Sequence, residues 1–200
     1  MLGKSLRVKR IVRELHSEAV FFTADHFMFG SIMTAPRRFS DVLSDPMVSW
    51  ITIIEAELTR TNEPQAVVAT FPEMLLAKEH IMAVAITGEP LYDDERRLLR
   101  YSHRNPERLY NSVPPYDIEG AGHLGKAAEL HTIFSTEARE FLPFTEASIV
   151  LTSNPDVHLR AEVILVNRRA ICSLSRSKEV SEEGKTEDQP SQGAPSAEKE

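Results

Sequence analysis

The sequence has few of the residues that stabilise small domains covalently or through metals. Cys172 is the single cysteine among 200 residues, which excludes an intrachain disulfide and a cysteine-rich zinc site. No apolar run of about 18 residues or more occurs, so no membrane-spanning helix is expected. Residues 1–10 carry charges without the apolar segment of a secretory signal. These absences predict a soluble, cytoplasmic protein.

An excess of positive charge is also lacking. The chain has 23 basic and 30 acidic residues, a formal net charge of −7. This balance argues against a general binder of polyanions, although a local basic patch is compatible with it. Hydrophobic residues make up 42% of the chain and charged residues 26%, so the composition supports a folded core.

The last part of the chain differs in composition from the rest. Residues 176–200 contain no aromatic side chain and, apart from Val180, almost no large apolar one. Such a segment buries too little apolar surface to offset the entropy lost on ordering. We therefore expect an acidic, disordered tail over residues 176–200.

The remainder of the sequence resembles one unit written twice. A shift of 90 residues places Gly30 on Gly120 and Ile81 on Ile171, with a basic residue three positions before each isoleucine. A period of this length is too long for a solenoid and fits two tandem domains of one type. The expected organisation is a first unit over 1–90, a connecting helix and linker over 91–108, and a second unit over 109–175.

Each unit is predicted to be rich in β-strands. Ala19–Thr23 and Phe27–Met33 are β-branched and aromatic runs around a turn, which is typical of a hairpin. In the second unit, Pro114 and Pro115 occupy the corresponding turn. Trp50–Leu58 has the composition of a strand.

Further strands and one short helix complete each predicted unit. Apolar and polar residues alternate over 157–163, the period of a strand with one buried face. Arg38–Ser44 favours a short helix, and Asn167–Arg169 predicts the turn of another hairpin. Five strands and one small helix indicate a small barrel or a strongly twisted sheet. Because each unit is small, the two are expected to pack on each other.

Three blocks of the second unit carry a resemblance. The blocks are Tyr116–Gly120, Phe141–Ala147 and Val163–Ile171. In this order they resemble a small bacterial β-rich domain family of unknown function, over roughly 109–174. The first unit departs from the family pattern at Trp50–Thr52 and at Ala77. The resemblance implies a β-rich fold and no particular activity.

One glycine motif raises the possibility of a nucleotide site. Gly120–Gly125 spells G-x-G-x-x-G, the pattern that cradles a pyrophosphate between a strand and a helix. The segment before it is short and polar, whereas the dinucleotide motif follows a buried apolar strand. We therefore interpret the motif as a strand bend or loop, with nucleotide or ligand sensing as the alternative.

The residues that carry most enzyme chemistry form no recognisable constellation. The seven histidines include no His-x-x-x-His pair, so no metal site is predicted. Cys172 is expected to be a buried, inert thiol, and no base is identified for it. Glu55 and Glu146 occupy related places and are expected to be exposed strand residues. No catalytic residue, metal or cofactor is therefore predicted.

Basic residues near the end of the second unit are the candidate interaction residues. These are Arg160, Arg168 and Arg169, and a second basic cluster lies at Arg7–Arg13. Small barrels often bind nucleic acid through such faces, but no aromatic residues are interleaved with these arginines.

The sequence as a whole predicts a non-enzymatic structural or protein-interaction module. Its expected partner is another protein or its own copy, reached through an edge strand such as Ala66–Thr70. A nucleic-acid-binding small β-barrel is the first alternative, and a nucleotide- or ligand-sensing domain is the second.

Overall fold

The structure is a computed structural model of the 200-residue chain. It describes residues 16–34, 37–88, 106–123, 129–131 and 139–177. The basic cluster at 7–13, most of the expected connecting helix and nearly all of the expected tail lie outside these residues. Two boundaries differ from expectation, because β6 already begins at Pro106 and Arg176 is the last residue of β10.

The described chain is mainly β-structure, as predicted. Its first part contains β1 (His16–Phe22), β2 (His26–Met33), α2 (Phe39–Leu43), β3 (Trp50–Arg60), β4 (Glu63–Ala77), the 3-10 helix η1 (Lys78–His80) and β5 (Ala83–Ile86). Its second part contains β6 (Pro106–Val113), β7 (Tyr116–His123), β8 (Phe141–Leu151), β9 (Asn154–Asn167), η2 (Arg168–Ala170) and β10 (Ser173–Arg176). Below, 16–88 is called the first half and 106–177 the second half.

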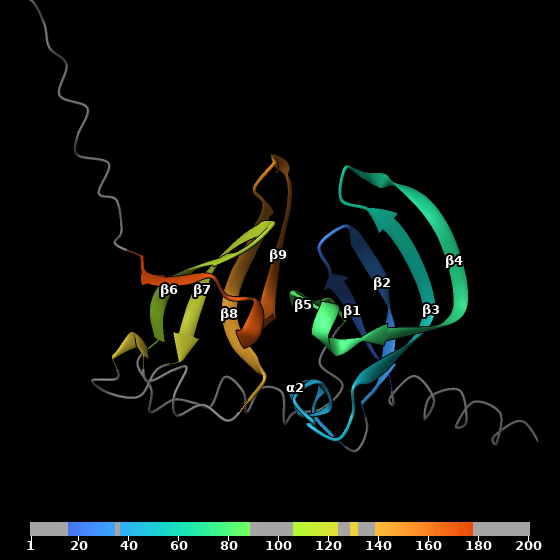
Figure 1. Cartoon of the computed structure of the whole chain (residues 1–200), viewed down its shortest axis with the longest axis horizontal. Helices are drawn as coiled ribbons and strands as arrows, with labels where there is room; N and C mark the ends of the chain where they lie inside the picture. Colours follow the sequence, from blue (N-terminus) through green and yellow to red (C-terminus); the bar gives the residue numbers. More distant parts are fainter. Residues whose placement is uncertain (1–15, 35–36, 89–105, 124–128, 132–138, 178–200) are drawn as a thin grey trace, which may run out of the picture.

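The strands form one antiparallel sheet of ten strands in the order β10-β6-β7-β8-β9-β5-β1-β2-β3-β4 (Figure 1). The sheet is open, because β10 and β4 are its two end strands. Within the first half the order is β5-β1-β2-β3-β4, and within the second it is β10-β6-β7-β8-β9.

The two halves meet where β5 pairs with β9. Ala83 lies opposite Val166 and Ile86 lies opposite Val163, with the two intervening pairs in register. The Asn167 N–H donates to the Met82 carbonyl at 2.9 Å and extends the ladder by one residue. We call this contact between β5 and β9 the inner joint. The expected packing of the two halves on each other is therefore present.

A bulge interrupts the pairing at a similar place in each half. Glu55 and Glu146 have positive φ values of 51° and 47°, the left-handed region that non-glycine residues seldom adopt. The ladder with the preceding strand shifts register at Gly30 and at Gly120. At both glycines a Cβ atom would lie within 3 Å of the neighbouring strand. The bulges therefore depend on glycine for close approach of the backbones.

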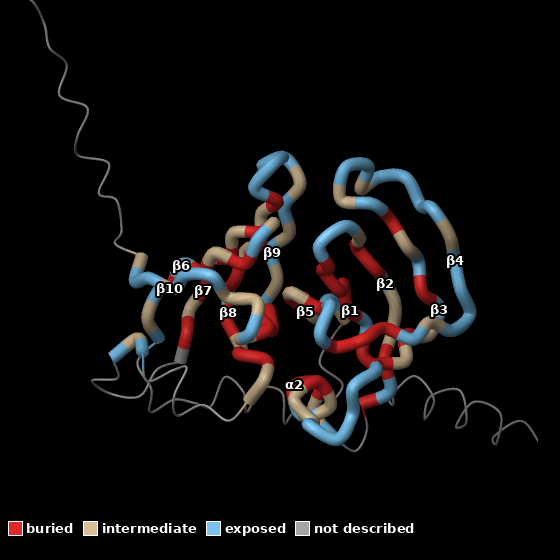
Figure 2. Tube along the Cα trace, in the orientation of Figure 1, coloured by how far each residue is buried: buried red, intermediate tan, exposed pale blue. Residues whose placement is uncertain are grey.

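Two clusters of buried apolar side chains form the core (Figure 2). The larger cluster combines Val20, Phe22 and Phe27 of the first half with residues of β6–β9. The other is built on the first half but includes Phe141 and Leu165 of the second. Because both clusters cross the inner joint, the halves share their hydrophobic stabilisation.

The short helix predicted over Arg38–Ser44 is confirmed as α2. Phe39 and Leu43 are buried on one face of the helix, four residues apart as one helical turn requires. Asp45 follows the helix, where the Met47 N–H and the Arg37 guanidinium donate to its carboxylate at 2.9 and 2.7 Å. These donors hold the pKa of Asp45 below its ordinary value of 3.8.

The hairpin predicted around Asn167–Arg169 is wrong. β9 continues into η2, which redirects the chain, and β10 then pairs with β6 at the far end of the sheet. The side chain of Asn167 accepts from the Arg169 N–H at 3.0 Å and favours this 3-10 turn over a two-residue hairpin. The hairpins β1–β2 and β6–β7 are confirmed.

Candidate functional site

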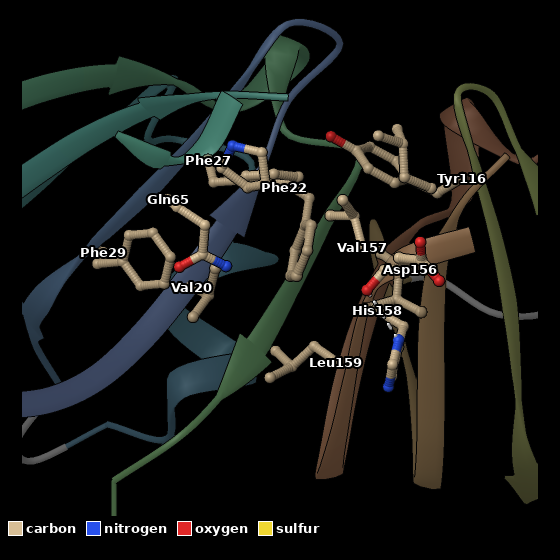
Figure 3. Close-up of a pocket in the computed structure, with 13 residues that line it drawn as sticks. Val20, Phe22, Phe27, Phe29, Gln65, Tyr116, Asp156, Val157, His158 and Leu159 are labelled. Atoms are coloured by element: carbon tan, nitrogen blue, oxygen red, sulfur yellow. Dashed lines mark hydrogen bonds between the residues drawn. The ribbon is translucent and has the colours of Figure 1, made fainter. Parts of the chain in front are cut away.

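A cleft of about 260 Å³ opens between the two halves beside the inner joint (Figure 3). One wall comes from β1, β2 and the start of β4, and the other from β7, β8 and the outer part of β9. The β3–β4 and β8–β9 hairpins project on the same side of the molecule and flank it (Figure 1). Its lining residues are Val20, Phe22, Phe27, Phe29, Pro64, Gln65, Tyr116, Ile149, Leu151, Asp156, Val157, His158 and Leu159.

Three aromatic rings form the deep part of this cleft. Phe22 packs edge-on against Phe27 and against Tyr116, with ring centroids 5.5 Å apart in both pairs. Phe27 and Tyr116 lie 6.2 Å apart. Edge-to-face packing at such distances is favourable beyond the area that the rings bury. The aromatic group therefore fixes the second half against the first.

The Tyr116 hydroxyl adds a directional contact across the same boundary. It donates to the Thr23 carbonyl at 2.5 Å. Burial, with a smaller contribution from Asp25, raises the pKa of Tyr116 well above its ordinary value of 10.0. The phenol is therefore a neutral hydrogen-bond donor in the folded protein and contributes to the contact between the halves.

Polar groups lie at the rim of the cleft. Asp156 and His158 are exposed on β9, and Gln65 is exposed on β4. The Nδ1 atom of His158 lies 3.1 Å from the Asp156 carbonyl oxygen. Apolar walls with a few polar rim groups suit an extended, largely apolar chain segment.

Lys78 also connects the halves. Its ammonium donates to the Asp45 carbonyl at 2.8 Å and lies 3.4 Å from a carboxylate oxygen of Glu140 in the second half. The Asn167 side-chain amide donates to the Ile81 carbonyl at 2.8 Å. Lys78 and Asn167 are both buried, so these polar contacts are protected from water and fix the register of the inner joint.

The outer edge of β4 is the second feature of the candidate site. β4 is 15 residues long and has no sheet partner beyond β3 among the described residues. The β4 strand exposes several large apolar side chains, namely Val67, Val68, Phe71 and Leu75. An unpaired, apolar strand edge is a template for pairing with another chain.

Comparisons with known proteins name no relative. A scan of protein-family models, a search of curated proteins and a search of solved structures each found no match to this chain. The resemblance to a bacterial β-rich family therefore stays a prediction.

The three candidate arginines do not form one patch. Arg160 is exposed in the middle of β9, whereas Arg168 and Arg169 lie in η2, about 26 Å further along at the rise of a β-strand. Arg169 lies 3.7 Å from Glu140, whose carboxylate also lies 3.4 Å from the Lys78 ammonium. The arrangement does not favour a continuous surface for a phosphate backbone.

Gly120 and Gly122 lie within strand β7 and not at a turn into a helix. A Cβ on Gly122 would overlap a methyl carbon of Leu109, so this glycine serves close packing. The strand-bend interpretation fits these two glycines. Gly125 lies outside the described residues.

The remaining candidates differ in outcome. Cys172 is exposed, so the prediction of a buried thiol is wrong; it lies between η2 and the edge strand β10 and not inside a central strand. Glu55 and Glu146 are exposed, as predicted.

Within the described ranges, no group of three or more His, Cys, Asp or Glu side chains is placed to hold a metal ion. None of the helices described is long and apolar enough to cross a membrane.

Sequence reasoning did not identify the cleft. The signal that was available is the aromatic residues around the two hairpin turns, with Phe22 and Phe27 flanking the first and Tyr116 following the second. Only the pairing of β5 with β9 brings these two turns together, and that pairing is not readable from local pattern.

Proposed function

We propose that this chain is a non-enzymatic protein-interaction module that binds other chains by strand addition to the free edge of β4. One observation carries the proposal: β4 ends the sheet of described strands, and its 15-residue outer edge has no strand partner among those residues and exposes apolar side chains. Main-chain hydrogen bonds would supply affinity, and the exposed side chains would supply specificity.

We also propose that the chain arose as a tandem duplication of a five-stranded unit. Three observations support it. The strand order is the same in the two halves. The bulge residues Glu55 and Glu146 share their unusual backbone conformation. Equivalent hydrogen bonds recur at an offset of 90 residues, as when Met82 donates to Phe22 and Cys172 donates to Ser112, both at 2.8 Å. The inner joint is then an example of edge-to-edge pairing between two units.

The test compares capture of proteins by the wild type and by an edge variant in extracts of the native cell. We expect Val68→Lys to lose most wild-type partners, because a charged residue on an edge strand opposes strand addition. The control is Val150→Lys, the same change on the interior strand β8. Both variants are first checked for unchanged thermal unfolding. Equal capture by Val68→Lys and the wild type would show that the β4 edge is not the binding surface.

A further inference from the structure

We infer that copies of this chain assemble head to tail, with the end of β4 in one copy pairing antiparallel with β10 of the next. The inference rests on the proposed function, because it names a second copy as a partner of the same edge. The outer edges of β4 and β10 have no partner within the described part of the chain and lie at opposite ends of the sheet, so they do not pair with each other in one copy (Figure 1).

The inner joint is the template for this contact. Antiparallel neighbours alternate in the side to which their backbone groups point. Since the Asn167 N–H bonds to Met82, the backbone groups of Val163 and Leu165 also face β5. The residues of β5 that face β9 are Val84 and Ile86 by the same alternation. These positions define the edge that each half offers at the joint.

The outer edge of β10 repeats the hydrogen-bond pattern of β5, and the end of β4 repeats that of β9. Thr87 donates to the Glu18 carbonyl at 3.1 Å, and Ser177, 90 residues later, donates to the Arg108 carbonyl at 2.9 Å. β10 is therefore held on β6 as β5 is held on β1 and presents its outer edge in the same way. Lys78 donates to Ser49 and Arg168 donates to Glu140, both at 2.9 Å, so the ends of β4 and β9 correspond as well.

Corresponding residues are buried at the inner joint and exposed at the outer edge of β4. Phe141 pairs with Asn167 in the sheet, and Trp50 pairs with Ala77 at the corresponding place in the first half. Phe141 is fully buried at the inner joint, whereas Trp50 is 58% exposed at the free edge. Leu165 is likewise fully buried, whereas its counterpart Leu75 is 62% exposed. A second copy placed on β4 would cover Trp50 and Leu75.

Charge is complementary in the transferred register. Shifting the pairs of the inner joint by 90 residues places Leu75 opposite Leu174 and Glu73 opposite Arg176. Arg176 also pairs with Glu107 of its own copy at 2.7 Å, so Glu73 would be a second acidic neighbour of this guanidinium. Opposite charges in directly facing strand positions stabilise pairing. Pro72 does not interrupt the outer ladder, because by the same alternation its backbone faces β3.

Two polar contacts of the inner joint are missing from the transferred one. Ala77 replaces Asn167, so the side-chain bond to the Ile81 carbonyl has no equivalent. Ser49 replaces Glu140, so the ion pair with Lys78 has none either. The contact between copies is therefore weaker than the inner joint, and assembly depends on protein concentration. Such a head-to-tail contact produces a ring or an open filament, depending on whether the rotation closes.

Disulfide trapping tests the register. The bond from the Asn167 N–H to the Met82 carbonyl transfers to Ala77 and Cys172, and a single such bond brings two Cα atoms within the distance that a disulfide spans. We expect Ala77→Cys to give dimers and larger species under mild oxidation that reducing agent removes. The controls are Ala66→Cys, at an exposed position elsewhere on β4, and Ala77→Cys combined with Cys172→Ser. Cross-linking of Ala77→Cys at the level of either control would overturn the proposed register.

Sedimentation velocity of the unlinked protein tests the assembly itself. We expect the wild type to sediment as larger species with rising concentration, and Glu73→Arg and Arg176→Glu each to weaken association by about tenfold or more. Mixing the two variants in equal amounts is expected to restore assembly, because each then offers the opposite charge to the other. Thermal unfolding checks that both variants fold.

The outcomes separate the two proposals. A wild type that stays monomeric, or a mixture that associates no better than its components, would overturn head-to-tail assembly. If Val68-dependent capture of another protein persisted in that case, the proposed function would stand without self-assembly. If both were lost, the free β4 edge would have no binding role.

Discussion

Tyr116 is the residue that most clearly couples local chemistry to the contact between the halves. Its ring packs on Phe22 and Phe27, and its hydroxyl donates to Thr23 across the boundary. Loss of the donor to a buried carbonyl destabilises the folded state, because no water replaces the lost hydrogen bond. The residue therefore combines apolar packing with one hydrogen bond whose strength depends on the protonation of the phenol.

We expect Tyr116→Phe to lower the free energy of unfolding by about 1 kcal/mol at pH 7, because the bond to Thr23 is lost. The raised pKa of Tyr116 means that the folded state favours the neutral phenol. Its contribution is complete below the ordinary pKa of 10.0 and is lost as the pH rises above it. Urea unfolding of both proteins between pH 8 and about pH 11 measures the difference.

The sign of the pH effect distinguishes this account from a simple packing loss. The advantage of the wild type over Tyr116→Phe should shrink once the pH exceeds the ordinary phenol pKa. Tyr110, whose pKa is raised chiefly by a hydrogen bond to Asp117, is present in both proteins and cancels in the difference. A difference that stays constant across the alkaline range would contradict the assignment.

The bulges are the features that shape individual strands. Each combines a residue of positive φ on one strand with a glycine on the strand beside it, Glu55 with Gly30 and Glu146 with Gly120. A bulge bends its strand and increases the local twist. The bulges therefore contribute to the curvature of a sheet that stays open.

Substitutions at the second bulge should change stability in opposite directions. In Gly120→Ala the new Cβ would lie 2.7 Å from the Ala147 Cβ and 3.1 Å from its Cα, so we expect a loss of about 2 kcal/mol. Glu146→Gly relieves a φ of 47° and is expected to gain up to about 1 kcal/mol. Urea unfolding measures both. A Gly120→Ala protein as stable as the wild type would show that the strands separate without cost.

The sequence predicted the elements whose cause is local. The turn at Pro114 and Pro115 and the helix beginning near Phe39 follow from residues next to one another in the chain. The hairpin predicted at Asn167 failed because the partner of β10 is decided by contacts with β6, far away in the sequence. The same reason explains Cys172, whose exposure follows from the position of β10 at the end of the sheet.

At the scale of the whole molecule, the halves share one sheet and both hydrophobic clusters. A unit of this size on its own buries a small core, so packing across the inner joint supplies a large part of the stability. The cleft and the pair of free edges exist only at this scale. For that reason no motif in the sequence predicts the cleft, although the sequence predicts an edge strand over Ala66–Thr70.

Unfolding of the described core should therefore be a single transition. Trp50 is the only tryptophan of the chain and lies in the first half, so its fluorescence reports on that half. Ile118→Val removes one buried methyl group from the second half and is expected to cost about 1 kcal/mol. We expect the Trp50 transition to move to lower temperature by about 2–4 °C together with the far-ultraviolet circular dichroism signal. A Trp50 transition that does not move would mean that the halves unfold independently.

Pairing β5 with β9 inside one polypeptide also has an arithmetical consequence. Since two five-stranded halves are fused in each chain, a closed circle of such chains always contains an even number of halves. Circles of five or seven halves are inaccessible to it, whatever the angle between neighbours. Strong and weak contacts would also alternate around the circumference, so dilution would break it into whole chains and never into single halves.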